Sequence, residues 1–167
     1  MLRTASVFCV FLALVGLAQP QEVRDFSGVY TLKRFTHSDS NHPRDTTNVP
    51  AGQTTLKIAQ SAISMELSYT LGSGKTVVRR YTLDGRDSAN MEFDGTPTTD
   101  QASVKGRTLT IHSTIEVTAG LLKGIPVHRT SRWELSRDLK TLIAHDQIEI
   151  QGKHVIGDTL TAVYVRQ

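Results

Sequence analysis

The chain has 167 residues, with 19 lysine and arginine side chains against 16 aspartate and glutamate side chains, which gives a formal net charge of +3. These charges are interspersed and form neither a basic block nor a basic-aromatic stripe. Proteins that bind nucleic acid carry such a footprint, so composition and charge argue against nucleic acid as a partner.

The first 18 residues, MLRTASVFCVFLALVGLA, have the pattern of a secretory signal peptide. One positive charge, Arg3, precedes an apolar run from Val7 to Leu17, and the small residue Ala18 favours cleavage before Gln19. The apolar run is shorter than the ~20 residues that span a bilayer, and no later segment approaches that length. We therefore expect an exported protein, periplasmic or extracellular, without a membrane span.

Removal of these 18 residues from the 167 leaves 149, residues 19–167. A chain of this length forms one domain and buries about 70% of its unfolded surface. Cleavage also removes Cys9, the only cysteine, so the mature domain depends on its hydrophobic core and not on a disulfide. We expect a single, monomeric domain.

Apolar and polar residues alternate with period two along most of the mature chain, and no long helical period appears. Between Thr108 and Thr118, for example, Leu109 and Ile111 face one side while His112 faces the other. This alternation is typical of half-buried strands in an antiparallel sheet. The pattern predicts ten strands, near residues 26–35, 53–60, 63–71, 75–83, 87–93, 100–104, 107–118, 126–136, 141–151 and 154–166.

Short turns join most of these segments and indicate an up-and-down meander. A long meander must protect its edge strands, and closure into a barrel is the usual way. We therefore predict an all-β, antiparallel up-and-down barrel of about 8–10 strands, closed by its first and last strands. The exception is a polar connection over residues 36–53, for which a lid over the barrel mouth and a disordered stretch both fit.

Four short motifs support this fold. They are DFSGVYTL from Asp25, YTLDGRD from Tyr81, VKGRTLTI from Val104 and SRWELSRDLKTL from Ser131. Together they resemble exported bacterial lipocalin-like (calycin-type) small β-barrel proteins, which implies a lipocalin-like fold and export. The chain departs from the family pattern at Tyr30, where a tryptophan is usual. It also departs at Leu139, where a turn glycine is usual, so we expect that turn to take another shape.

The hairpin around Arg137 to Lys140 predicts which side chains face the barrel interior. With a four-residue loop, Ser131 lies opposite Asp146, and Trp133 lies on the same inner row. Arg129 is then diagonal to Asp146, within reach of a long side chain. We expect Arg129 and Asp146 to pair.

The turn from Gly72 to Gly74 predicts a second inner surface. Its register places Arg79 and Tyr81 on one face with Met65 and Tyr69. The interior then holds two arginines against one aspartate. An unpaired buried charge costs several kcal/mol, so the second arginine implies water in a cavity, an anionic ligand group or a residue that is assigned to the wrong face.

An interior of this kind suits a small hydrophobic or amphipathic anion, because apolar contacts hold its tail and a guanidinium binds its carboxylate. The predicted ligand-binding residues are Tyr30, Met65, Tyr69, Arg79, Tyr81, Arg129, Trp133 and Asp146. A filled barrel fits the same residues, with a structural pair of Arg129 and Asp146 and with Arg79 at the solvent-exposed rim. Such a barrel would be an envelope or secreted protein-interaction module without a ligand.

The sequence carries no catalytic motif and predicts a non-catalytic protein without a cofactor. The mature chain has no cysteine, no Gly-x-Ser-x-Gly elbow and no His-Glu-x-x-His. Residues that only folding brings together leave no motif, so an enzyme stays an alternative. A metal site formed by His112, His128, Glu116 and Glu149 on the outer face is another alternative, although such residues are ordinary on a solvated face.

Overall fold

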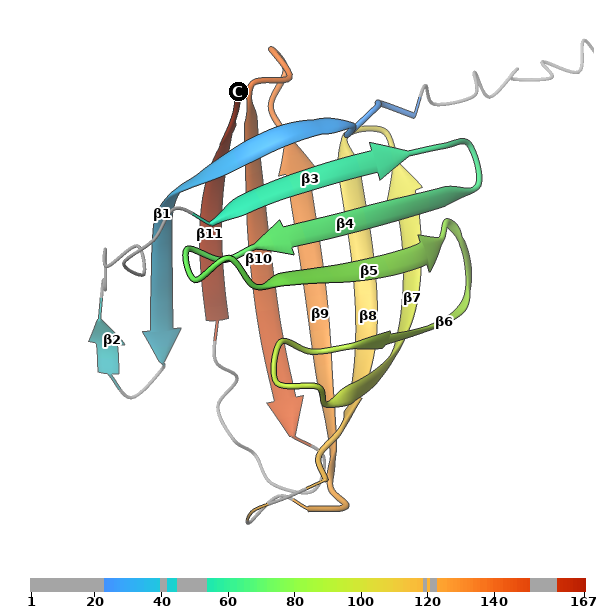
Figure 1. Cartoon of the computed structure of the whole chain (residues 1–167), viewed down its shortest axis with the longest axis vertical. Coiled ribbons are helices and arrows are strands. Elements are labelled where there is room, and N and C mark those ends of the chain that lie inside the picture. The colour runs from blue at the N-terminus through green and yellow to red at the C-terminus, as the bar shows by residue number, and fades with distance from the viewer. Residues whose placement is uncertain (1–22, 40–41, 45–53, 119, 121–122, 151–158) are drawn as a thin grey trace, which may run out of the picture.

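The computed structural model describes residues 23–39, 42–44, 54–118, 120, 123–150 and 159–167. These residues form one antiparallel sheet (Figure 1). Its strands are β1 (Gly28–Asp39), β2 (His42–Arg44), β3 (Thr55–Gln60), β4 (Ser64–Thr70), β5 (Thr76–Thr82), β6 (Asp84–Met91), β7 (Pro97–Lys105), β8 (Thr108–Glu116), β9 (Pro126–Leu135), β10 (Thr141–Ile150) and β11 (Thr159–Arg166). Over these ranges no helix has the length and apolar character needed to cross a membrane.

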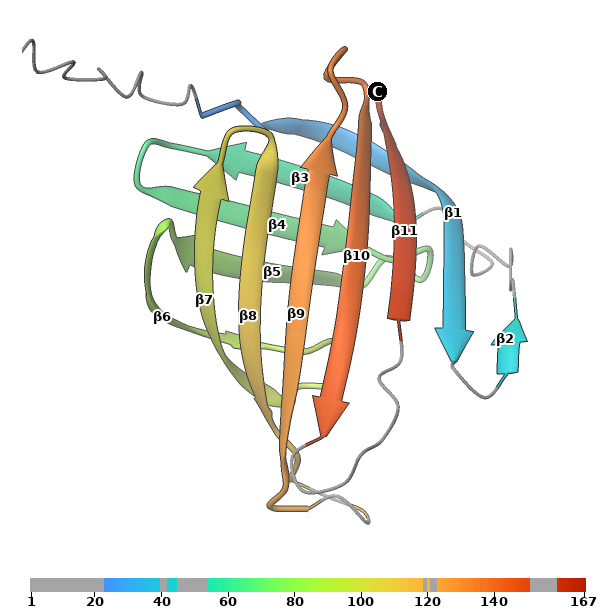
Figure 2. The ribbon, with the colours of Figure 1, turned by 180° about the vertical axis from the view of Figure 1, so that it is seen from behind.

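Ten of the strands follow one path, in the order β5-β4-β3-β1-β11-β10-β9-β8-β7-β6, and β2 pairs with β1. The sheet curls into two layers, so that β3, β4 and β5 cross steeply over β8, β9 and β10 (Figures 1 and 2). The predicted all-β, up-and-down barrel is therefore confirmed, and its first and last strands pair as expected.

Strand β1 links the two layers. Its first residues, from Gly28 to Thr31, pair with β3, and the segment from Tyr30 to Ser38 pairs with β11. The register shifts between Leu32 and Arg34. An extra residue at such a bulge bends a strand and increases its twist. The bulge explains how β1 runs along β3 and then turns down beside β11 (Figure 1).

The barrel is nearly closed rather than sealed. The meander pairs the predicted strands near residues 75–83 and 87–93, but the two described strands β5 and β6 share no backbone ladder. Asp84 already belongs to β6 and pairs with Ser103 of β7. Side chains of β6 bridge the seam instead, because Ser88 Oγ accepts a hydrogen bond of 3.1 Å from the Thr82 N–H of β5.

The long connection predicted over residues 36–53 begins later than expected. Strand β1 continues to Asp39, because His37 and Ser38 find partners in β11 and the short strand β2 pairs with the same end of β1. Residues 40–41 and 45–53 lie outside the described residues, as does the predicted leader over residues 1–18.

The hairpin between β9 and β10 has the predicted register, with Ser131 opposite Asp146. Our expectation of another turn shape is wrong, because Leu139 adopts the left-handed conformation with a φ of 60°. This conformation costs a non-glycine residue roughly 1 kcal/mol. Two contacts offset the cost: the Asp138 carboxylate accepts a hydrogen bond of 3.1 Å from the Lys140 N–H, and the Leu139 side chain packs against the core.

The hydrophobic core contains buried side chains from both layers, among them Leu56 and Leu67 from β3 and β4 and Leu109 and Leu142 from β8 and β10. Tyr30 also lies here, and its hydroxyl donates a hydrogen bond of 2.8 Å to the Phe26 carbonyl. These residues fill part of the barrel and leave a cavity in the rest.

Candidate ligand-binding cavity

A cavity of about 290 Å³ lies inside the barrel. This volume is at the lower end of the ~300–1,000 Å³ that is typical of small-molecule sites. The lining residues are Leu32, Phe35, Thr54, Tyr69, Leu71, Arg79, Tyr81, Glu92, Phe93, Ile111, Arg129, Ser131, Trp133, Ala144, Asp146, Leu160, Ala162 and Tyr164. They come from both layers of the sheet, so the barrel interior is not filled in the way the interaction-module interpretation requires.

Aromatic rings form one part of the cavity wall. Trp133 of β9 stacks on Tyr164 of β11 with 6.2 Å between ring centroids, and Tyr69 of β4 meets Trp133 edge-on at 6.4 Å. Phe93 in the β6–β7 turn meets Tyr69 edge-on at 5.6 Å. These contacts join three strands and a turn around an apolar surface, which is suited to a hydrocarbon group.

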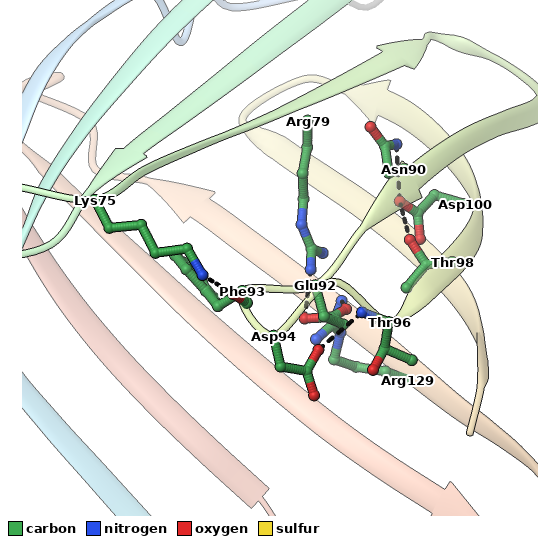
Figure 3. A network of polar contacts seen from close by, with 10 residues as sticks. All are labelled: Lys75, Arg79, Asn90, Glu92, Phe93, Asp94, Thr96, Thr98, Asp100 and Arg129. Carbon is green, nitrogen blue, oxygen red and sulfur yellow. Dashed lines mark hydrogen bonds and ion pairs between the residues drawn. The ribbon is translucent and has the colours of Figure 1, made fainter. Parts of the chain in front are cut away.

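Charged side chains form another part of the wall, and Glu92 is at their centre (Figure 3). Its carboxylate accepts a hydrogen bond of 2.7 Å from Arg129 Nη2 and makes an ion pair with Arg79 Nη2. Burial by itself raises the pKa of Glu92, but the hydrogen bonds from Arg79 and Arg129 outweigh it, so that the pKa lies below its ordinary value. Glu92 therefore stays ionised and supplies a counter-charge to both arginines.

Asp146 does not make the expected ion pair with Arg129, whose Nη2 pairs with Glu92 instead. Among the described residues, Asp146 Oδ1 has no hydrogen-bond partner. Burial raises the pKa of Asp146, although the Ser131 hydroxyl and the two arginines oppose the shift. Asp146 is thus a buried carboxyl group on the cavity wall whose neutral form is favoured more than in water.

Six of the eight predicted site residues lie together around the cavity: Tyr69, Arg79, Tyr81, Arg129, Trp133 and Asp146. Tyr30 and Met65 face inward as expected but belong to the filled core instead, where both are almost completely buried. The alternation of residues fixes which face of a strand a side chain occupies. It does not fix the depth at which that side chain lies along the barrel, which explains the two misplaced residues.

Several buried polar atoms of the residues that line the cavity have no hydrogen-bond partner among the described residues. Arg79 Nε, Arg129 Nε and Trp133 Nε1 are buried donors without a hydrogen-bond partner in the described part of the chain. Each such group costs about 1–3 kcal/mol when it stays unpaired.

The sequence did not identify Glu92 as a site residue. The predicted strand over residues 87–93 contains Glu92, but β6 ends at Met91 and Glu92 lies in the turn that follows, so strand alternation does not describe the direction of its side chain. The available signal is the charge imbalance, since a further acidic residue is one way to compensate two inward arginines against one aspartate, and Glu92 directly follows the end of β6.

The outer-face histidines have the predicted neighbours. His112 lies 3.2 Å from the Thr130 hydroxyl, and His128 lies 3.4 Å from the Thr114 hydroxyl. The described residues contain no group of three histidine, cysteine or acidic side chains able to hold a metal ion.

No family model and no curated protein sequence matches the chain, but solved structures share its fold. The ileal bile acid-binding protein of zebrafish, complexed with cholic acid, has a TM-score of 0.58 over 85% of this chain and 98% of its own, at 11% identity. A fatty-acid-binding protein from brain tissue of Drosophila melanogaster has a TM-score of 0.54 over 84% and 99%, at 18% identity. Fatty-acid-binding protein 1 of Echinococcus granulosus has a TM-score of 0.55 over 84% and 96%, at 8% identity. The chain therefore has the β-barrel fold of these fatty-acid- and bile-acid-binding proteins.

Proposed function

We propose that this protein is an exported, non-catalytic binding protein that holds a small hydrophobic or amphipathic ligand with an acidic head group inside its barrel. The observation that carries the proposal is the cavity itself, which combines an aromatic wall with two inward arginines. The structures with the same fold are named for binding bile acids and fatty acids, and this supports the same class of ligand here. Export rests on the leader over residues 1–18.

The two parts of the wall suit the two parts of such a ligand. Removal of a hydrocarbon chain from water contributes about 25 cal/mol for each Å² of apolar surface buried. Guanidinium groups such as those of Arg79 and Arg129 bind carboxylates through charge-assisted hydrogen bonds. The volume of about 290 Å³ favours a ligand of modest size, such as a medium-chain fatty acid.

Trp133 provides a direct test, because it is the only tryptophan in the chain and lines the cavity. Titration with decanoic acid should change its emission in a saturable way, at one ligand per chain. The variant Ala144→Leu should weaken binding strongly, because a leucine side chain on β10 fills the cavity beside Trp133. The variant Ala162→Leu fills it from β11 and should have the same effect.

The matched control is Ala59→Leu, because Ala59 lies exposed on β3 and outside the cavity lining. It should bind decanoic acid like the wild type. If the cavity-filling variants fold, by circular dichroism, and still bind as the wild type does, the ligand lies elsewhere and the proposal is wrong. An absence of any saturable change would also contradict it.

A further inference from the structure

The carboxylate of Glu92 lies beside the guanidinium groups of Arg79 and Arg129, where the acidic head group of a ligand would bind. Both arginines on the cavity wall already bind one carboxylate, which belongs to the protein itself. We propose that Glu92 is a built-in counter-ion for which an acidic ligand exchanges, so that this residue sets the head-group preference of the cavity. This inference rests on the proposed function, since it requires a ligand inside the barrel.

The location of Glu92 allows the exchange. The residue follows the end of β6 at Met91 and precedes β7, so its side chain can move without breaking a strand ladder. Its backbone N–H donates a hydrogen bond of 2.8 Å to the Thr96 carbonyl, and Gly95 donates one of 3.0 Å to the Glu92 carbonyl. Glu92 thus begins a short turn that is closed within itself.

The exposure of the three side chains gives the direction of the movement. The side chain of Glu92 is 17% exposed, that of Arg129 is 14% exposed and that of Arg79 is 6% exposed. A carboxylate that leaves the arginines can therefore reach water over a short path, while the more deeply buried Arg79 side chain stays inside. Two buried guanidinium groups need a counter-charge, and after exchange the ligand carboxylate supplies it.

The exchange has a consequence for specificity. In the wild type, the carboxylate of the ligand gains contacts that Glu92 gives up, so the preference for a fatty acid over an alcohol of the same chain length is smaller than it would be without Glu92. Without the Glu92 charge, a ligand carboxylate provides the missing counter-ion for both arginines, while an alcohol provides none. Hydrogen bonds to charged groups are worth enough to shift affinity roughly 10- to 100-fold.

The test compares decanoic acid and decanol at neutral pH, with Trp133 emission as the readout. The variant Glu92→Gln should bind decanoic acid roughly 10- to 100-fold more tightly than the wild type and bind decanol unchanged. The control Glu66→Gln removes the same charge from the outer face, where Glu66 pairs with Arg80 at 2.9 Å. It should leave the ratio of the two affinities unchanged.

The outcomes separate this inference from the proposed function. If decanoic acid and decanol bind to the wild type but Glu92→Gln leaves the ratio of their affinities unchanged, the exchange is wrong and the binding function stands. If neither ligand binds to the wild type or to the variant, the proposed function itself fails.

A measurement on the wild type covers the case in which Glu92→Gln does not fold. Amide hydrogen exchange should become faster over residues 92–96 when decanoic acid binds, because the turn loses its attachment to the arginines. Decanol should not produce this change. Equal protection of the turn with both bound ligands would overturn the proposal.

Discussion

The side-chain amide of Asn90 hydrogen-bonds both backbone groups of Arg80. Its Oδ1 accepts a bond of 2.8 Å from the Arg80 N–H, and its Nδ2 donates one of 2.9 Å to the Arg80 carbonyl. These are the two bonds that a neighbouring strand would make at this position. Because the described strands β5 and β6 share no ladder, the last seam of the barrel is held here by a side chain, which also bonds the buried Asp100 carboxylate at 2.9 Å (Figure 3).

Replacement of this amide should therefore loosen the seam. The variant Asn90→Ala leaves the Arg80 backbone groups and one oxygen of buried Asp100 without these bonds, which we expect to lower the free energy of unfolding by about 2 kcal/mol. Urea unfolding measures this loss. The control Gln101→Ala removes an exposed amide that bonds Asp87 at 2.9 Å and should change stability by no more than about 0.5 kcal/mol. Equal effects of the two variants would show that Asn90 does not hold the seam.

The variant Asp146→Asn should change how stability depends on pH. Burial raises the pKa of Asp146 in the folded protein. The contribution of this carboxyl group to the free energy of unfolding is therefore fully present below the unfolded pKa of ~3.9, and it is lost as pH rises through the pKa of the folded protein. Asparagine stays neutral, and Asp146→Asn should therefore be more stable than the wild type at neutral pH. The difference should shrink as pH falls toward ~3.9.

Asp138→Asn is a control variant whose change in stability at neutral pH should have the opposite sign. Hydrogen bonds from Ser136 and Lys140 lower the pKa of Asp138, so its contribution is present above the unfolded pKa and is lost as pH falls through the folded value. This variant should be less stable than the wild type at neutral pH. Urea unfolding across the pH range checks both variants, and a less stable Asp146→Asn at neutral pH would contradict the account of that cavity carboxyl.

Gly28 is required because of a close approach to Arg166. A Cβ atom added at Gly28 would lie 2.7 Å from Arg166 Nε. The guanidinium of Arg166 lies over the ring of Tyr30, 5.4 Å from its centroid, and donates to the Ser27 carbonyl. The arginine thus has little freedom to move away where β1 and β11 close the barrel.

The variant Gly28→Ala should lower the free energy of unfolding by about 1–3 kcal/mol, which is the usual cost of overpacking. In an Arg166→Ala background the same substitution should cost less, because the side chain that it meets has been shortened. Unfolding measurements on the four proteins of this double-mutant cycle give the coupling. Additive effects of the two substitutions on the free energy of unfolding would mean that position 28 and Arg166 do not interact.

The proposed leader over residues 1–18 can be tested through its removal. When the full chain is expressed in a bacterium with an intact secretion pathway, the exported protein should begin at Gln19, and mass spectrometry should show the loss of residues 1–18. The variant Ala18→Leu should process poorly, because the cleavage site requires a small residue there. Recovery of the full-length chain from the cytoplasm alone would refute the signal peptide.

The inward rows of the barrel could be predicted because hairpin turns are local. A four-residue loop set the register that faces Ser131 toward Asp146, and the turn from Gly72 to Gly74 placed Arg79 opposite Leu67. Each register follows from residues within one hairpin, so period two and turn length were sufficient.

The features that the sequence did not predict depend on contacts between segments that are distant in the chain. Glu92 meets Arg129 across 37 positions of sequence, and it does so from a turn, where alternation carries no information. The missing ladder between β5 and β6 depends on how β6 pairs with β7, which the motif YTLDGRD does not encode. Tyr30 and Met65 differ from the cavity residues only in depth along the barrel, a property of the closed sheet as a whole.

The most direct test of the account is a crystal structure of the mature protein with decanoic acid bound. We expect electron density for one ligand in the cavity, with its hydrocarbon chain against Trp133 and Tyr164, its carboxylate at Arg79 and Arg129, and Glu92 turned toward solvent. Density for the ligand only on the outer surface, with the internal cavity free of it at saturating concentration, would contradict the account.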